Sequence, residues 1–232
     1  MAELIKKKIK VIFCDEKRNP SSELVSYYGS HDTSNKVRCQ IKWLPETKEA
    51  VWTEIVSEKI RKQKELLEYL GKEDSGLLDS YIKEIQWNDE TNQEGHAAKV
   101  YFNALFGMGF TRTADSVENA ALNYGYSIIL SAFTREITAN GYITQLGLFH
   151  DNMFNQFNLA SDLMEPFRVL VDQKAVSMDL SEFGQQEKME MVNLRNREVK
   201  IDGKVQYVNN AVKIYCKSVF DALNENDSSL IR

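Results

Sequence analysis

The sequence predicts a mainly α-helical fold, with a short strand segment near the N-terminus and a small β-hairpin near residues 198–208. Among its 232 residues are only 3 prolines and 11 glycines, too few turn formers for a sandwich or barrel of many short strands. Apolar residues make up 43% of the chain. Long stretches place them at every third or fourth position, as one face of a helix requires. Such a composition is enough to bury a sizeable core and excludes a disordered chain.

The N-terminal part is predicted to be mostly irregular. A short strand is expected from Val11 to Cys14, with no partner nearby, and residues 15–45 are rich in turn formers. Pro45 stands where a proline can open a helix. From residue 46 to residue 70, apolar side chains recur at threes and fours among lysines and glutamates. This pattern predicts a long amphipathic helix that Gly71 ends.

Three further helices are predicted in the middle of the chain. The first, at about residues 77–87, repeats the amphipathic pattern. The second spans about residues 92–106 and ends at Gly107. The third spans residues 117–140 and ends at Gly141. It is apolar nearly all round, which is typical of a helix buried at the centre of a domain.

The C-terminal part is predicted to contain more helices and one hairpin. A helix at about residues 160–172 has Pro166 early enough to be tolerated or to bend it. Asp202 and Gly203, between two alternating segments, are a strong signal for a two-residue hairpin. A short helix near residues 186–194 and a last amphipathic helix at about 210–223 complete the prediction, with a frayed tail.

Charge and cysteine content exclude several classes of protein. The 29 basic and 34 acidic residues give a net charge of −5, so any contact with DNA must come from local basic patches. Cys14, Cys39 and Cys216 form no CxxC pair, which argues against a disulfide framework and a cysteine zinc site and fits a reducing cytoplasm. The longest apolar region, about residues 120–133, is too short and too interrupted to span a membrane. The first residues do not resemble a signal peptide.

Residues 94–169 carry only 4 basic and 7 acidic side chains in 76 positions, so we expect them to form the core. An ionisable group in such surroundings needs a partner, a metal ion or a shifted pKa. On a helix over residues 160–172, Asp162, Glu165 and Arg168 share one face. They would be a metal ligand, a supporting acid and a phosphate contact, or else a surface ladder of charges, which spacing alone favours.

Glu94 and His150 also have structural alternatives. The sequence TNQE at residues 91–94 matches a capping box, in which Glu94 would bond back to the helix start. An isolated histidine such as His150 is more often hydrogen-bonded within a fold than a ligand, and His31 and His96 rank below it as ligands. One imidazole and two carboxylates would nevertheless suit Mn²⁺ or Mg²⁺.

Three separated segments carry a resemblance to a known family: QEGHAAKVYFNALFG, ENAALNYGYSIILSAFTREI and GLFHDNMFNQFNLASDLMEPFRVLVD. They resemble the CRISPR-associated integrase of spacer acquisition, the Cas-one family, in its type II form. The match extends upstream to VIFCDEKRNP and YYGSHDTS and downstream to the hairpin and last helix. The resemblance implies a helical catalytic domain at residues 46–232. It also implies that residues 1–45 are a remnant or linker from an N-terminal β-rich domain.

The same resemblance assigns roles to the residues discussed above. It implies that Glu94, His150 and Glu165 bind the catalytic metal and that Asp162 supports them. Two departures are Gln93, where arginine is expected, and Val169, where the family often has a proline. From the residues themselves, phosphate contacts would come from basic side chains that could equally be surface charges or ion pairs, and only Arg168 is favoured. These four are Lys99, Arg112, Arg135 and Arg168.

The implied activity is that of a metal-dependent DNA integrase and endonuclease of CRISPR adaptation, with Mg²⁺ or Mn²⁺ as cofactor. It would join the 3′-hydroxyl ends of a prespacer to the repeat by transesterification, and water in place of the hydroxyl would give nuclease activity. The implied partners are double-stranded DNA, a second copy in the full-length family, a Cas-two subunit and the RNA-guided effector nuclease. The alternative is a catalytically inactive helical domain that binds DNA or serves in assembly.

Overall fold

The structure, a computed structural model, describes residues 1–7, 9, 11–14, 16, 20–24, 30–178 and 180–232. The predicted mainly α fold is confirmed. The α-helices are α1 (Ala2–Lys6), α2 (Thr33–Ile41), α3 (Pro45–Tyr69), α4 (Ser75–Glu84), α5 (Gln93–Phe106), α6 (Val117–Ala139), α7 (Asn158–Leu163), α8 (Arg168–Ser177), α9 (Gln185–Val192) and α10 (Val208–Glu225). The short 3₁₀ helices are η1 (Trp87–Asp89), η2 (Glu165–Phe167), η3 (Asn193–Asn196) and η4 (Ser228–Leu230), and the strands are β1 (Val11–Cys14), β2 (Pro20–Leu24), β3 (Glu198–Ile201) and β4 (Lys204–Tyr207).

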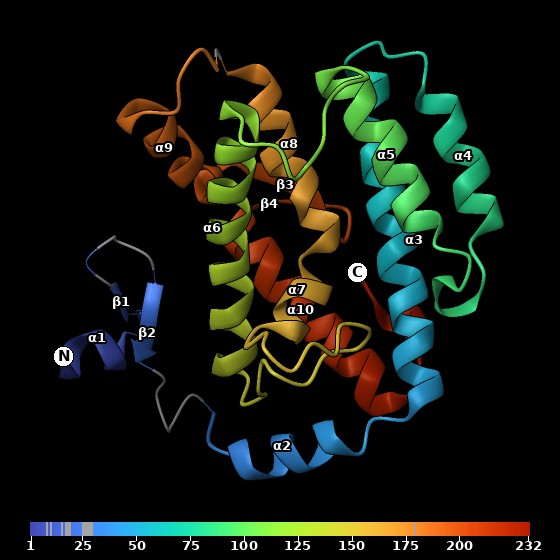
Figure 1. Ribbon diagram of the computed structural model, residues 1–232. Coiled ribbons are helices and arrows are strands. Elements are labelled where there is room, and N and C mark those ends of the chain that lie inside the picture. The colour runs from blue at the N-terminus through green and yellow to red at the C-terminus, as the bar shows by residue number, and fades with distance from the viewer. Residues whose placement is uncertain (8, 10, 15, 17–19, 25–29, 179) are drawn as a thin grey trace.

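Two groups of helices form the body of the molecule. Figure 1 shows α3, α4 and α5 on one side and α6, α8 and α9 on the other, with α10 between them. Helix α3 packs against α4, α5, α8 and α10, and α6 packs against α8, α9 and α10. None of the helices in the described part of the chain is both long enough and apolar enough to cross a membrane.

The N-terminal region is more regular than predicted. Strand β1 pairs antiparallel with β2, so the expectation of a strand without a nearby partner is wrong. Helix α2 lies within the segment expected to be irregular, of which residues 15, 17–19 and 25–29 are outside the described residues. The amide of Gln40 on α2 donates to the carbonyl oxygens of Ile143 (2.8 Å) and Leu146 (3.2 Å). Such contacts between distant segments stabilise a helix that local turn composition does not predict.

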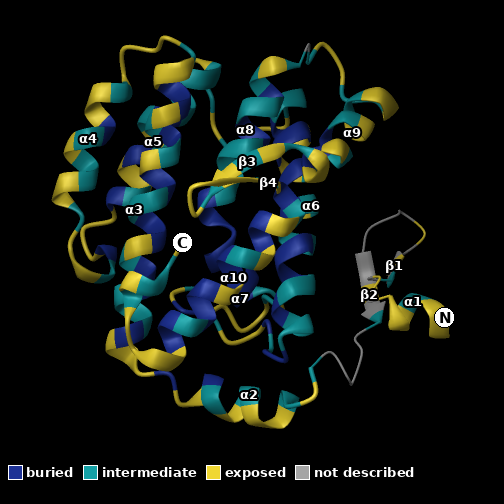
Figure 2. Cartoon of the chain, turned by 180° about the vertical axis from the view of Figure 1, so that it is seen from behind, coloured by how far each residue is buried: buried dark blue, intermediate teal, exposed yellow. Residues whose placement is uncertain are grey.

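The long helix predicted after residue 45 is confirmed as α3, with Pro45 at its first position. Its buried side is apolar except for Thr47, Lys59 and Gln63, which lie within the same stripe. Figure 2 shows this buried side turned toward the other helices. A lysine in such a stripe must be compensated, because burial of an isolated ammonium group is costly.

Helix α6 is as buried as its composition predicts, since only Ala120, Asn123 and Ser127 along it are exposed. A methyl group added at Gly125 would come within 2.3 Å of Val171 Cγ1, so α6 and α8 approach closely at this glycine. The backbone at Gly141 has a φ of 88°, a conformation that glycine adopts freely and that ends the helix as predicted.

The single helix predicted over residues 160–172 is wrong, because the chain is divided there into α7, η2 and α8. The break falls at Pro166, which has no backbone N–H to donate and whose ring disfavours a continuous α-helix. Glu165 therefore lies at the start of a 3₁₀ turn rather than in the middle of a helix.

The C-terminal hairpin is confirmed, with Asp202 (φ 49°) and Gly203 (φ 72°) as the two turn residues between β3 and β4. Helices α9 and α10 follow the predicted positions within a few residues. The expected fraying of the tail is wrong. The η4 turn packs against α10 and α3, and the backbone N–H of Arg232 donates to Ser218 Oγ at 3.1 Å.

Candidate active site

Asp162 organises the loop that carries His150. Its carboxylate is fully buried and accepts hydrogen bonds from the backbone N–H groups of Leu148 (2.6 Å), Phe149 (3.2 Å) and His150 (3.2 Å). The same carboxylate lies 2.5 Å from His150 Nδ1. A side chain at Gly147 would come within 2.3 Å of the His150 carbonyl oxygen, so this tight loop needs a glycine.

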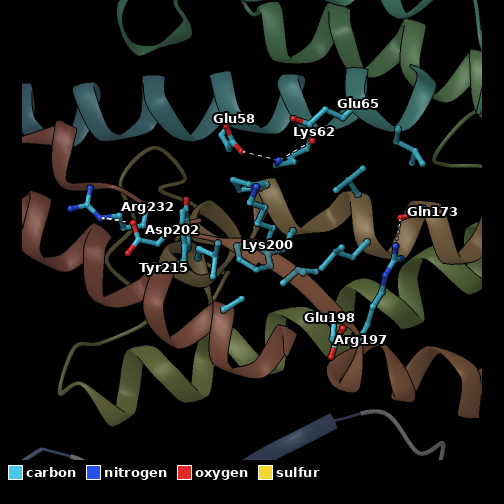
Figure 3. A pocket seen from close by; sticks show the side chains of 18 of the residues that line it. Glu58, Lys62, Glu65, Gln173, Arg197, Glu198, Lys200, Asp202, Tyr215 and Arg232 are labelled. Atoms are coloured by element: carbon cyan, nitrogen blue, oxygen red, sulfur yellow. Dashed lines mark hydrogen bonds and ion pairs between the residues drawn. The ribbon is translucent and has the colours of Figure 1, made fainter. Parts of the chain in front are cut away.

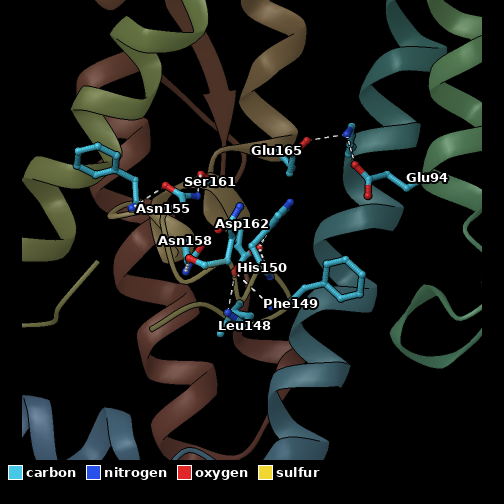
Figure 4. Close-up of polar contacts among 12 residues, drawn as sticks. Glu94, Leu148, Phe149, His150, Asn155, Asn158, Ser161, Asp162 and Glu165 are labelled. Carbon is cyan, nitrogen blue, oxygen red and sulfur yellow. Dashed lines mark hydrogen bonds and ion pairs between the residues drawn. The ribbon is translucent and has the colours of Figure 1, made fainter. Parts of the chain in front are cut away.

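The bond to Asp162 raises the pKa of His150 above its ordinary value, although partial burial opposes the shift. The charges of Glu165 and Glu94 also raise this pKa, so the imidazole lies within electrostatic reach of both carboxylates. In Figure 4 the ring points from the Asp162 side toward Glu165. Since Nδ1 is taken by Asp162, Nε2 is the nitrogen left for a ligand.

Lys59 joins the two glutamates that sequence resemblance singles out. Its Nζ lies in direct contact with Glu94 Oε1 and 2.6 Å from Glu165 Oε2. Figure 4 marks the interactions of Glu94 and Glu165 with dashed lines at its right. The side chains of Lys59 and Glu165 are only 10% and 4% exposed. Arg168 Nε donates to the other oxygen of Glu165 at 2.8 Å. Glu94 and Glu165, from separate helices, therefore converge on one cation.

The pKa values of this buried cluster are set by its mutual charges. Burial alone would raise the pKa of Glu165, but Lys59 and Arg168 outweigh burial and hold it below its ordinary value. Burial alone would lower the pKa of Lys59, but Glu165 and Glu94 outweigh it and raise this pKa. At neutral pH Glu165 is therefore a carboxylate and Lys59 an ammonium.

The capping box predicted at residues 91–94 is wrong. The start of α5 is capped by Asp89, whose Oδ1 and Oδ2 accept from the backbone N–H groups of Gln93 (2.8 Å) and Glu94 (3.0 Å). Asp89 is held in the preceding 3₁₀ turn, which brings its carboxylate over the helix start. The Glu94 side chain is therefore not used for capping and reaches Lys59.

Of the four predicted phosphate contacts, Arg168 alone touches a candidate ligand. Its guanidinium lies 4.7 Å from the centre of the Tyr126 ring. Arg112 lies 5.3 Å from the same ring and donates to Asn123 Oδ1 at 2.7 Å, which orients its side chain on α6. Arg135 instead pairs with the neighbouring Glu136 at 3.2 Å, and Lys99 is an exposed residue of α5.

The competing histidines lie elsewhere. His31 is exposed and 4.0 Å from Asp32, and the ring of His96 packs against Tyr81.

A further buried carboxylate, Asp172, was not expected from the sequence. It accepts a hydrogen bond from the Tyr101 hydroxyl at 2.8 Å and another from the Tyr126 hydroxyl. Burial raises its pKa to about 6, although both hydroxyls oppose the shift. For Asp172, the signal available in the sequence was its place one turn after Arg168. For Lys59, it was a lysine within the apolar stripe of α3.

Among the described residues, no three histidine, cysteine, aspartate or glutamate side chains are gathered closely enough to hold a metal ion as they stand. The donor set nevertheless fits a hard divalent cation. Two carboxylates already share one cation, the Lys59 ammonium, and His150 is oriented by a carboxylate in the way that metal-bound histidines commonly are. Glu94, Glu165 and Nε2 of His150 are the atoms that would hold such an ion.

A cavity of about 500 Å³ lies nearby but is distinct from this cluster. It is bounded by α3, η2, α8, β3 and α10. In Figure 3, Lys200 points into its middle, and Asp202 with Arg232 closes one end. Pro166 and Phe167, the two residues after Glu165, line it, whereas Glu94, His150 and Glu165 do not. Glu94 and Glu165 therefore lie outside this cavity.

Comparison with known families places this geometry in context. Residues 1–188 match the family model for the CRISPR associated protein Cas1. The chain belongs to the Cas1 family. The CRISPR-associated endonuclease Cas1 of Neisseria meningitidis serogroup C (strain 8013) is 36% identical over 163 residues, which is 70% of this chain and 54% of that protein. The Cas1 1 endonuclease of Francisella tularensis subsp. novicida (strain U112) is 26% identical over 189 residues, 72% of this chain and 59% of that protein.

Solved structures share the fold of this Cas1 chain. The match to a chain of a Cas6-RT-Cas1–Cas2 complex covers 100% of this chain and 30% of that chain, with a TM-score of 0.75 and 18% identity. The match to a casposase bound to its integration product covers 97% of this chain and 80% of the casposase chain, with a TM-score of 0.70 and 19% identity. This chain spans little more than half the length of the curated relatives described above.

Proposed function

We propose that this chain is the catalytic part of a metal-dependent DNA integrase and endonuclease of CRISPR adaptation. The observation that supports it most directly is the convergence of Glu94 and Glu165 on one cation beside His150. Family membership and the likeness in fold to a casposase bound to its integration product support the same reaction class. The cofactor would be Mg²⁺ or Mn²⁺, held by Glu94, His150 and Glu165.

The residues of the chain have distinct roles in this proposal. Bound Mg²⁺ or Mn²⁺ would polarise a phosphodiester and offset the charge that develops on its oxygens. Asp162 fixes the His150 ring, so that Nε2 is presented without further ordering. Arg168 uses Nε to orient Glu165, which leaves its terminal nitrogens for a phosphate oxygen. A 3′-hydroxyl as nucleophile gives joining by transesterification, and water gives cleavage.

The proposed partners follow from the same family. They are double-stranded DNA as prespacer and repeat, a second copy of the chain, a Cas2 subunit and the RNA-guided effector nuclease. Two of these have support in the structural neighbours, one a Cas1–Cas2 complex and the other a casposase bound to its integration product.

The decisive experiment measures cleavage and strand transfer on branched DNA with and without Mn²⁺. We expect Glu94→Ala, His150→Ala and Glu165→Ala each to lose at least about a hundredfold in rate, because each removes one proposed ligand. His96→Ala, an exposed histidine on the same helix as Glu94, is the matched control and should keep full activity.

Activity that survives all three ligand substitutions would remove this site from the proposal. DNA binding without turnover by the unaltered chain would favour the alternative of a helical assembly module. In that case Mn²⁺ should not raise its melting temperature, because only a ligand bound by the folded state does so.

A further inference from the structure

Lys59 is a charged residue at a buried position of α3 where packing alone would favour an apolar side chain. Its neighbours along the buried stripe of α3, Val56 and Ile60, are fully buried apolar side chains. An apolar side chain would continue that stripe, whereas a lysine brings a charge that must be compensated. The compensation comes from Glu94 and Glu165 together, the two carboxylates of the proposed metal site.

The charges of the cluster balance without a metal ion. Lys59 and Arg168 contribute two positive charges, and Glu94 and Glu165 contribute two negative ones. A divalent ion bound to the same carboxylates would lie within a few ångströms of the ammonium, and two cations that close repel strongly where water is scarce. The ammonium and the ion therefore compete for the same oxygens.

We propose that the Lys59 ammonium is the resident counter-cation of this site. It holds Glu94 and Glu165 together when no divalent ion is bound, and it gives up at least one of the two carboxylates when the ion enters. This inference rests on the proposed function, because it concerns the same pair of ligands. The flexible four-carbon stem of lysine suits this role, since the ammonium moves by side-chain rotation without displacement of α3.

The arrangement differs from the contact between Arg168 and Glu165. That bond joins residues three apart on successive turns and uses an oxygen of Glu165 that Lys59 does not touch. Arg168 therefore keeps its partner when Lys59 moves, and Lys59 is the cation whose displacement frees both carboxylates. Lys59 is thus a positioning residue with respect to the metal.

The test is a direct measurement of Mn²⁺ binding, by titration calorimetry and by electron paramagnetic resonance of free Mn²⁺. Lys59→Met keeps an unbranched apolar side chain, slightly shorter than that of lysine, but removes the charge. We expect its Mn²⁺ affinity to be at least tenfold higher than that of the unaltered chain. Its melting temperature in EDTA should be lower, and the increase on adding Mn²⁺ larger, because Glu94 then loses its ion pair with Lys59 and Glu165 keeps only the one with Arg168.

Two further variants make the result specific. Lys62→Met, one turn along the same helix, removes a lysine that pairs with Glu58 and Glu65 at the half-exposed surface, and it should leave Mn²⁺ affinity unchanged. Lys59→Gln, which keeps a hydrogen-bond donor, provides the measurement if Lys59→Met does not fold by circular dichroism. It should also bind Mn²⁺ more tightly than the unaltered chain.

Unchanged or weaker Mn²⁺ binding in the Lys59 variants, with binding still abolished by Glu94→Gln, would overturn this inference and leave the proposed function standing. Absence of any Glu94-dependent Mn²⁺ binding in every variant would overturn both.

Discussion

Glu165 in η2 and Asp172 in α8 are two buried carboxylates whose partners differ in kind. The oxygens of Glu165 meet the cations of Lys59 and Arg168. Those of Asp172 meet the neutral hydroxyls of Tyr101 and Tyr126. Both side chains are almost completely removed from water.

Their pKa values move in opposite directions for that reason. Burial raises the pKa of Asp172 to about 6, because hydroxyl groups cannot offset the loss of hydration fully. Burial is also the largest influence on Glu165, but two adjacent cations reverse its effect and lower the pKa. Partner charge, rather than depth of burial, therefore decides the direction in which each pKa moves.

The largest expected difference between the two is in DNA cleavage. Glu165→Gln keeps the shape of the side chain but removes the charge, and we expect it to lower the Mn²⁺-dependent rate on the order of a thousandfold, about 4 kcal/mol. Asp172→Asn is the matched neutralisation and should change the rate by only a few fold. Similar losses in the two variants would show that the acid buried against tyrosines takes part in the reaction.

Asp172 should also impose a pH dependence on stability. In the folded state it keeps its proton up to about pH 6, whereas the unfolded chain loses it near 3.8. The folded state thus binds more protons in this interval, so the free energy of unfolding falls as pH rises from 3.8 to 6. The size of this effect is about 3 kcal/mol.

Urea unfolding at several pH values measures how the free energy of unfolding changes between pH 3.8 and about 6. Asp172→Asn should remove this slope, whereas Glu165→Gln should leave it in place. The lowered pKa of Glu165 has the opposite sign, so its contribution to stability is lost only as pH falls below its ordinary value of 4.5. A slope that persists in Asp172→Asn would contradict the assignment.

Features that depend on local backbone chemistry can be predicted from this sequence. The ends of α5 and α6 fall at Gly107 and Gly141, which adopt a positive φ, and the hairpin turn falls at Asp202 and Gly203. The amphipathic stripe of α3 is likewise visible in the spacing of its apolar residues. Each of these signals lies within a few residues of the feature it specifies.

The incorrect predictions concern side-chain contacts and helix ends that the local residue pattern does not specify. TNQE at residues 91–94 has the form of a capping box, yet Asp89 caps the helix because the preceding turn delivers its carboxylate there. Glu94 is then directed to Lys59, a contact that spacing along the chain does not encode. Lys59 and Asp172 could be suspected only as charges within apolar surroundings. Their partners come from other helices, so their identity requires the fold.

A third carboxylate, Asp162, extends the comparison, because its partners are backbone N–H groups. Asp162→Asn replaces one acceptor oxygen by a donor and leaves part of the Leu148–His150 loop unpaired, which we expect to cost about 2 kcal/mol in the free energy of unfolding. It should also lower the pKa of His150, measured by NMR titration, since the bond to Asp162 is what raises it. Asp151→Asn, an exposed acid in the same loop, should change neither quantity.

The smallest expected effects come from the two tyrosine hydroxyls that donate to Asp172. Tyr126→Phe and Tyr101→Phe each remove one hydrogen bond from the carboxylate, and each should cost about 1 kcal/mol and raise the pKa of Asp172 further. The upper end of the pH range over which stability falls should therefore rise in both variants.

Of these two tyrosines, Tyr126 is the one whose ring lies against Arg168 and Arg112, and a phenylalanine at this position keeps the ring. Tyr126→Phe should consequently cleave DNA as fast as Tyr101→Phe, whereas Tyr126→Leu, which removes the ring, should be slower. If Tyr126→Phe alone lost activity, the Tyr126 hydroxyl would contribute to the site beyond its bond to Asp172. The separation between a carboxylate paired with cations for catalysis and a carboxylate bonded to hydroxyls for packing would then fail.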